Sequence, residues 1–228
     1  MLKNMLYVLS VGGSLIYPPE GIDIKFINSF ADYIKKEINL DKRFILVSGG
    51  GQGARDYIKA AESLKINKEY QDHLGINATR QNASLLKAYF KELAYKKIIT
   101  EPKEKINFKQ KIALAGGWKP GRSTDYVSVL LAKTYGADTV VNLSNIDYVY
   151  DKDPRLKGAK KLKNLTWSDF RDIVGNEWTP GKNAPFDPVA ARLAMNSKIK
   201  VYILNGKKIN NLKNCLDKKD FIGTTIKD

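Results

Sequence analysis

Three clusters of glycine occur in this 228-residue chain, each directly after a short apolar run: Gly12-Gly13-Ser14, Gly49-Gly50-Gly51 and Gly116-Gly117. Glycine has no Cβ, so the backbone N–H groups of such turns can converge on a phosphate. A helix that begins at the turn adds its own free N–H groups and its dipole. At each position, the alternative is a glycine that only allows the chain to turn. Three such turns together favour an anion-binding site.

Basic and acidic side chains follow these turns. Arg55 lies in the first turns of a predicted helix, where it could bridge phosphate oxygens bidentately. Arg122 lies just before another predicted helix start, which Thr124 or Asp125 could cap. Asp125 is also placed where a carboxylate could orient Mg²⁺ or hydrogen-bond donors around a transferring phosphoryl group. An exposed helix arginine is the alternative for Arg55, and capping alone is the alternative for Asp125.

A polar segment over 142–154 follows a predicted strand. Its Ser144, Asn145, Tyr150 and Asp153 could recognise a purine and its ribose. The alternative is a polar turn that ends at Pro154.

Two familiar phosphate motifs match only in part. Gly49-x-Gly51-x-x-Ala54 has dinucleotide-fingerprint spacing, but Asp72, the nearest acid at the required distance, precedes a predicted helix and does not follow a strand. Residues 116–123 have P-loop spacing, but Arg122 stands where lysine is required and Pro120 lies inside the loop. Both interpretations are disfavoured.

The elements that must position these residues alternate between apolar strands and amphipathic helices. The predicted strands are 5–12, 43–48, 111–115, 138–143 and 199–204, and the predicted helices are 23–38, 52–64, 73–95, 124–135, 166–174, 187–197 and 209–216. Such alternation is typical of an α/β fold with a mostly parallel sheet covered on both faces. Ligands bind such sheets beyond the carboxyl ends of the strands, where the glycine clusters fall.

Composition excludes several classes of function. Hydrophobic residues make up 43% of the chain, which is enough for a core, and no apolar run is long enough to span a bilayer. One histidine, His73, leaves no multi-histidine metal site, and one cysteine, Cys215, favours a reducing, cytoplasmic setting. The net charge of +15 is spread over the chain, so RNA binding is a weak alternative to phosphate attraction.

The glycine clusters and their neighbours, taken in order, resemble the amino-acid-kinase superfamily, and most closely its archaeal-type uridylate (UMP) kinases. The motifs that carry this resemblance are 9–15, 47–55, 72–76 with 78–83, and 116–125, supported by 145–154, 186–191 and 223–226. Any one motif is weak, but the ordered set covers nearly the whole chain.

The resemblance implies an αβα sandwich with a largely parallel sheet of about eight strands, forming one domain over 1–228. It implies transfer of the γ-phosphoryl group of ATP to UMP with Mg²⁺, in a homohexamer built from dimers and active in pyrimidine biosynthesis. The expected lobes are 1–115 on the UMP side and 116–228 on the ATP side.

The resemblance also implies roles for individual residues. Those expected to be catalytic are Asp125, Arg122 and Gly13. Those expected to bind ATP are Gly12, Gly13, Ser14, Gly51, Arg55, Ser144, Tyr150 and Asp153. Those expected to bind UMP are Gly50, Asp72, Trp118, Lys119, Pro120, Gly121, Arg122, Ser123 and Thr124.

The chain departs from the superfamily pattern in places. Ser10 stands where many members have lysine, and no lysine occupies the motif at 186–187. Lys119, Arg122 or Lys182 could supply the missing positive charge. Tyr148 replaces the usual glycine, and the insertion-like stretch 176–186 is unusual and has no assigned role. Two alternatives therefore remain: a superfamily kinase for a carboxylate, carbamate or isoprenoid phosphate, and a nucleotide-binding regulator without turnover.

Overall fold

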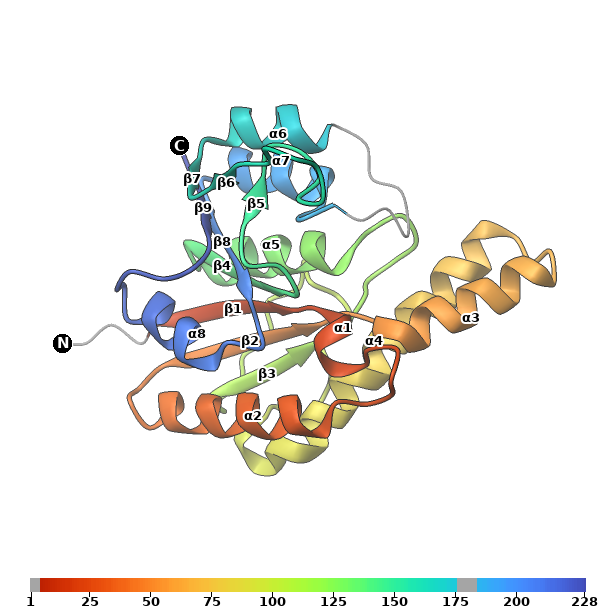
Figure 1. Ribbon diagram of the computed structural model, residues 1–228. Coiled ribbons are helices and arrows are strands. Elements are labelled where there is room, and N and C mark those ends of the chain that lie inside the picture. The colour runs from red at the N-terminus through yellow and green to blue at the C-terminus, as the bar shows by residue number, and fades with distance from the viewer. Residues whose placement is uncertain (1–4, 176–183) are drawn as a thin grey trace.

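A seven-stranded sheet forms the centre of the computed structural model, which describes residues 5–175 and 184–228 (Figure 1). Its order is β3 (Ile112–Ala115), β2 (Arg43–Ser48), β1 (Leu6–Val11), β4 (Thr139–Ser144), β8 (Lys200–Asn205), β9 (Thr224–Ile226) and β7 (Asn164–Leu165). The first five are mutually parallel, and β9 runs antiparallel to β8. A separate antiparallel ribbon consists of β5 (Val149–Tyr150) and β6 (Lys161–Leu162).

Helices cover both faces of the sheet, as the alternation predicts (Figure 1). Their bounds are α1 (Gly13–Ile16), α2 (Ile24–Ile38), α3 (Gly51–Ser63), α4 (Lys68–Phe90), α5 (Thr124–Tyr135), α6 (Trp167–Val174), α7 (Pro188–Asn196) and α8 (Ile209–Leu216). Leu9 and Val11 of β1 pack toward α2, α4 and α8, whereas Val8 packs toward α5, α6 and α7. This alternation along one strand produces the two cores of an αβα sandwich.

Helix boundaries follow from local capping. Helix α4 begins at Lys68, five residues before the predicted start, because the Asn67 side chain accepts a hydrogen bond from the Tyr70 N–H at 3.1 Å. It ends at Phe90 because Lys91 adopts a φ of 49°, and a short 3₁₀ helix (Lys91–Leu93) replaces the predicted last turn. The sequence did not predict β5, β6, β7 and β9, which span two or three residues each.

The strand order brings the carboxyl ends of β1, β2, β3 and β4 to one edge of the sheet. The Gly12 N–H donates to the Leu143 carbonyl, and the Gly49 N–H donates to the Val11 carbonyl, both at 2.9 Å. Helices α3 and α4 form a hairpin that extends away from this edge (Figure 1). Across residues 5–175 and 184–228, no helix combines the length and apolar character needed to cross a bilayer.

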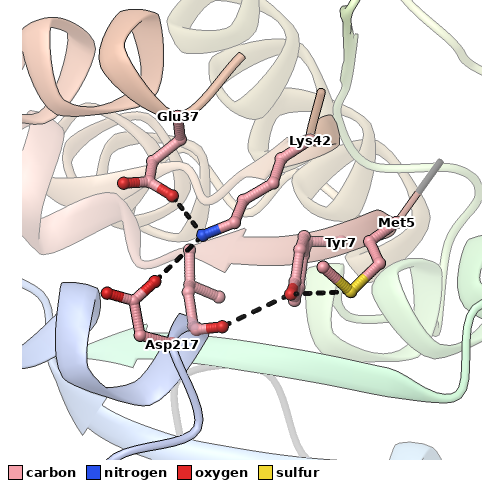
Figure 2. A network of polar contacts seen from close by, with 6 residues as sticks. Met5, Tyr7, Glu37, Lys42 and Asp217 are labelled. Atoms are coloured by element: carbon pink, nitrogen blue, oxygen red, sulfur yellow. Dashed lines mark hydrogen bonds and ion pairs between the residues drawn. The ribbon is translucent and has the colours of Figure 1, made fainter. Parts of the chain in front are cut away.

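An ionic cluster lies at the opposite end of the strands. Figure 2 shows the Lys42 ammonium group between the carboxylates of Glu37 and Asp217. The distance from Lys42 Nζ to Asp217 Oδ1 is 3.1 Å. Burial disfavours the charged ammonium group, but the two carboxylates outweigh this effect and raise the pKa of Lys42. The Tyr7 hydroxyl donates to the Leu216 carbonyl at 3.4 Å, so the cluster joins α8 to α2 and β1.

Candidate active site

The first two glycine turns touch through their backbones. A Cβ built on Gly13 would stand 2.0 Å from the Gly51 nitrogen, and a Cβ built on Gly49 would stand 2.4 Å from the Gly13 nitrogen. Any larger residue at Gly13 or Gly49 would have to displace backbone atoms. Glycine is therefore required by this close approach, not merely by the turn.

The third glycine turn is tied to the other two by helix α4. The Thr79 hydroxyl accepts from the Gly117 N–H at 2.6 Å, and the Asn82 amide donates to the Gly49 carbonyl at 2.8 Å. The Arg80 guanidinium donates to the Gly117 carbonyl at 3.1 Å. All three turns consequently lie together at one edge of the sheet, as the sequence predicts.

A cavity of about 310 Å³ opens between the α3–α4 hairpin and the loop 117–124; we call it the hairpin cavity. Of the residues expected to bind UMP, it is lined by Gly50, Asp72, Lys119, Pro120, Gly121, Arg122, Ser123 and Thr124. Trp118 is not among its lining residues. Its ring stacks on Tyr126 with centroids 6.5 Å apart, and its indole N–H donates to Glu101 at 2.9 Å.

Two residues expected on the ATP side line the hairpin cavity instead. These are Gly51 and Arg55, and both belong to the start of α3, which forms one wall of that cavity. Arg55 is exposed, and its Nε donates to the Gln52 side chain at 2.9 Å. Arg122 faces the same cavity from the opposite wall, with its guanidinium 5.0 Å from the centroid of the Tyr126 ring. The hairpin cavity is thus bordered by two arginines.

A second cavity, of about 590 Å³, is lined mainly by residues 144–155, together with Ile173, Ala184 and Pro185; we call it the loop cavity. It contains Ser144, Tyr150 and Asp153, which the sequence predicts for the adenine nucleotide. Hydrogen bonds from Arg155 hold the pKa of Asp153 at about 2, so this carboxylate is charged at neutral pH. Tyr148, the departure from the family pattern, also lines the cavity.

The turn between β1 and α1 stands between the two cavities. A Cβ on Gly12 would lie 2.7 Å from the Leu143 carbonyl oxygen and 3.8 Å from the Cα of Ser144, a lining residue of the loop cavity. Gly13 touches Gly51, a lining residue of the hairpin cavity. Gly12, Gly13 and Ser14 therefore line neither cavity, and the first two separate them.

Asp125 lies beside this turn. Its carboxylate accepts from the Ser10 hydroxyl at 3.1 Å and from the Asp187 N–H at 3.2 Å. Burial, and then the nearby charge of Asp187, raise the pKa of Asp125 to about 7. Asp187 also accepts a short hydrogen bond from the Ser123 hydroxyl. Sequence analysis missed the role of Asp187, although an Asp-Pro pair at a predicted helix start signals a capping residue.

The loop cavity lies within the expected lobe 116–228, whereas the hairpin cavity takes residues from both expected lobes. The loop cavity draws only on residues after 143. The hairpin cavity takes one wall from residues 50–79 and the other from 117–124, so a division at 115/116 runs through it. Lys182, one candidate for the missing positive charge, lies outside the described residues, as does most of the unassigned stretch 176–186.

Comparisons with known proteins agree with this architecture. The profile of the "Amino acid kinase family" matches residues 5–205. A uridylate kinase from Pyrococcus abyssi is 40% identical over 90% of this chain and 91% of its own, and one from Sulfurisphaera tokodaii is 37% identical over 97% and 99%. A solved uridylate kinase from Archaeoglobus fulgidus aligns with a TM-score of 0.84 and 32% identity, over 97% of this chain and 99% of its own. The chain therefore belongs to the amino acid kinase family.

Proposed function

We propose that this enzyme is a UMP kinase, which transfers the γ-phosphoryl group of ATP to UMP and yields UDP and ADP. Relatives named uridylate kinase cover about nine-tenths or more of the chain at 36–40% identity. One structural observation carries the proposal: two cavities of nucleotide size lie on either side of the Gly12–Gly13 turn. Two nucleotides bound there would present their phosphates to each other across a shared backbone surface.

UMP is assigned to the hairpin cavity. Its phosphate would lie between Arg55 and Arg122, near the starts of α3 and α5, which favour anions. Asp72 supplies a carboxylate that suits a ribose hydroxyl and that accepts from the Gly121 N–H at 2.8 Å in this structure. Trp118 takes part through its carbonyl, which accepts from Arg80 at 3.1 Å and so fixes the loop.

ATP is assigned to the loop cavity, the larger of the two. Ser144, Tyr150 and Asp153 would contact the adenosine part, with the phosphates running toward Gly12, Gly13 and Ser14. Because Gly51 and Arg55 line the hairpin cavity, they would meet ATP only at its terminal phosphate.

Phosphoryl transfer depends mainly on the alignment of the two nucleotides and on stabilisation of the developing charge, and it requires no covalent intermediate with the protein. The acceptor is already a phosphate, so no strong base is needed. Gly13 would present backbone N–H groups to the transferring group, Arg122 would stabilise its negative charge, and Asp125 would hold the start of α5 in place beside it. A single histidine in the sequence, His73, is then no objection to catalysis.

Magnesium would enter with ATP. Within residues 5–175 and 184–228, no three His, Cys, Asp or Glu side chains gather to hold a metal ion. A cage made of protein ligands therefore does not fit this site, and the nucleotide phosphates and water would carry the ion, as Mg²⁺ commonly prefers. No protein side chain is assigned as a ligand.

Assembly into a homohexamer in the cytoplasm, with a role in pyrimidine biosynthesis, completes the proposal. The α3–α4 hairpin supports self-association because Tyr57, Leu64 and Tyr70 expose 64%, 73% and 63% of their surface. A further cavity of about 360 Å³ lies on this hairpin, lined by Tyr17, Tyr57 and Leu74 among others. Light scattering tests the assembly: a particle of six chains supports it, and a monomer contradicts it.

The activity is tested with ATP, Mg²⁺ and a panel of acceptors: UMP, CMP, carbamate, glutamate, aspartate and an isoprenoid phosphate. Preferential formation of UDP is the expected result. Preference for another acceptor would make the chain a different kinase of the family. Tight nucleotide binding with no ADP release would make it a regulator.

A further inference from the structure

Asp187 makes more contacts than a helix cap requires. It is the N-cap of α7, where its Oδ1 accepts from the Val189 and Ala190 N–H groups at 2.6 and 3.3 Å. The residue is only 4% exposed. One oxygen is enough for capping, and serine caps helices about as well as aspartate. The second carboxylate oxygen is therefore available for another role.

That second oxygen joins α7 to α5. Asp187 Oδ2 accepts a short hydrogen bond from the hydroxyl of Ser123, which is itself the N-cap of α5 and accepts from the Tyr126 N–H at 3.1 Å. The Asp187 N–H donates to Asp125 Oδ2 at 3.2 Å. Two helix starts are thus locked together by side chains and by a backbone donor.

The two joined segments face different cavities. Ser123 and Thr124 line the hairpin cavity. Ala184 and Pro185, shortly before Asp187, line the loop cavity, and the Pro185 carbonyl accepts from Asn142 of β4 at 3.4 Å. Asp187 therefore lies at the junction of the walls that would hold the acceptor and the donor.

We propose that Asp187 is a positioning residue of the phosphoryl transfer, which fixes the hairpin cavity relative to the loop cavity through Ser123 and Asp125. The inference rests on the proposed function. Transfer between two bound nucleotides depends on their separation and alignment, and a displacement of about 1 Å can cost about 100-fold in rate. Placing a second carboxylate beside Asp125 is unfavourable for capping alone, which supports a role beyond the cap.

The test separates the link from the caps. Asp187→Ser keeps a capping oxygen for α7 but is too short to reach Ser123 as well. Ser123→Gly removes the linking hydroxyl, and glycine is tolerated at an N-cap nearly as well as serine. The double variant completes a cycle. Thr166→Gly is the matched control, because Thr166 caps α6 through a capping box and is not a lining residue of either cavity.

Each single variant is expected to lower kcat about 10- to 100-fold. The Kd for a non-hydrolysable ATP analogue, measured alone by calorimetry, should change less than about threefold in both single variants, and so should the Kd for UMP in Asp187→Ser. The double variant should be no slower than the slower single variant, and Thr166→Gly should keep the parent kcat.

Unchanged kcat in folded Asp187→Ser, or strictly multiplicative effects in the double variant, would overturn the inference. So would a loss of affinity for the ATP analogue as large as the loss of kcat, since this indicates a merely structural role. If Asp187→Ser does not fold, Ser123→Gly decides by the same criteria. If the parent enzyme does not phosphorylate UMP, the proposed function fails separately; kcat is then measured with the acceptor found by the panel, and the same split is expected.

Discussion

Gly13 and Gly51 approach so closely that a Cβ on Gly13 would stand 2.0 Å from the Gly51 nitrogen. These residues belong to turns after adjacent parallel strands, β1 and β2. Their contact makes one continuous backbone surface, with the hairpin cavity on one side and the loop cavity on the other.

Gly13→Ala is expected to disrupt this surface. The added methyl group must push backbone apart, and overpacking of this kind costs about 1–3 kcal/mol of stability. We expect kcat to fall at least about 100-fold, because the turn that separates the cavities must move. Gly136→Ala is the control: Gly136 has a φ of 73° and open space at its Cβ position, so it should lose stability but keep kcat. Equal kcat values in the two variants would contradict the role given to Gly13.

Asp125→Asn is expected to reduce turnover far more than binding. Asparagine has nearly the same shape but only one acceptor oxygen, so it cannot accept from both the Ser10 hydroxyl and the Asp187 N–H, and the start of α5 loses one of the two contacts that hold it in place. We expect kcat to fall about 10- to 100-fold, because a displacement of about 1 Å at a reacting centre can cost about 100-fold in rate. Steady-state kinetics measure the change in kcat, and calorimetry measures the change in the Kd values for comparison. Asp138→Asn, at the opposite end of β4, is the control. Equal kcat values in the two variants would show that Asp125 takes no part in the reaction.

The raised pKa of Asp125 also predicts a pH dependence of stability. The folded protein holds a proton on this carboxyl up to about pH 7, whereas the unfolded chain releases it near the ordinary value of 3.8. The folded state therefore binds more protons between these values, and the contribution of Asp125 to the free energy of unfolding falls as the pH rises from about 4 to 7. Urea unfolding of the parent and of Asp125→Asn at pH 5 and pH 8 measures this contribution to the free energy of unfolding. The variant should gain stability relative to the parent at pH 8; a constant difference at both pH values would contradict the shift.

Arg55→Ala is expected to weaken the binding of UMP more than the binding of ATP, because Arg55 lines the hairpin cavity. A charge-assisted hydrogen bond to phosphate, discounted for the exposure of Arg55, corresponds to about a tenfold rise in the KM for UMP. The KM for ATP should change less than about threefold. Lys59→Ala removes an exposed charge from the same helix without touching the cavity and should change neither constant. A larger loss for ATP would instead support the sequence-based assignment of Arg55.

Lys42→Met is expected to destabilise the fold without affecting the chemistry. It would leave the carboxylates of Glu37 and Asp217 without their cation, and breaking a buried ionic cluster costs about 3–5 kcal/mol. Lys111→Met removes an exposed pair with Asp41 and should cost less than about 1 kcal/mol. Denaturant unfolding measures both, and similar values would show that the buried cluster contributes no more than a surface pair.

The sequence was sufficient to predict the parallel strands of the central sheet and the edge where the glycine turns meet. Continuous apolar runs identified β1, β2, β3, β4 and β8, since strands buried on both faces have that pattern. The convergence of the glycine turns followed, because carboxyl ends of parallel strands share an edge. Strands of two or three residues, such as β5 and β9, carry no periodicity and were missed. The start of α4 was also missed, because it depends on one side-chain cap from Asn67.

The site was predicted in part. The residues of the loop cavity lie within one stretch of chain, so their grouping was visible as a polar segment. The contacts of Asp125 with Ser10 and Asp187 join residues 115 and 62 positions apart, and no local spacing encodes them. The sequence assigns Gly51 and Arg55 to ATP, whereas both line the hairpin cavity, because the packing of α3 on α4 sets which cavity the start of α3 faces.

The most direct test is a crystal structure of the enzyme with UMP and a non-hydrolysable ATP analogue bound together. Uridine is expected in the hairpin cavity near Asp72, and adenine is expected in the loop cavity near Tyr150. The phosphates of the two nucleotides should face each other against the backbone of Gly13. Both nucleotides in one cavity, or phosphates directed away from Gly13, would contradict this arrangement.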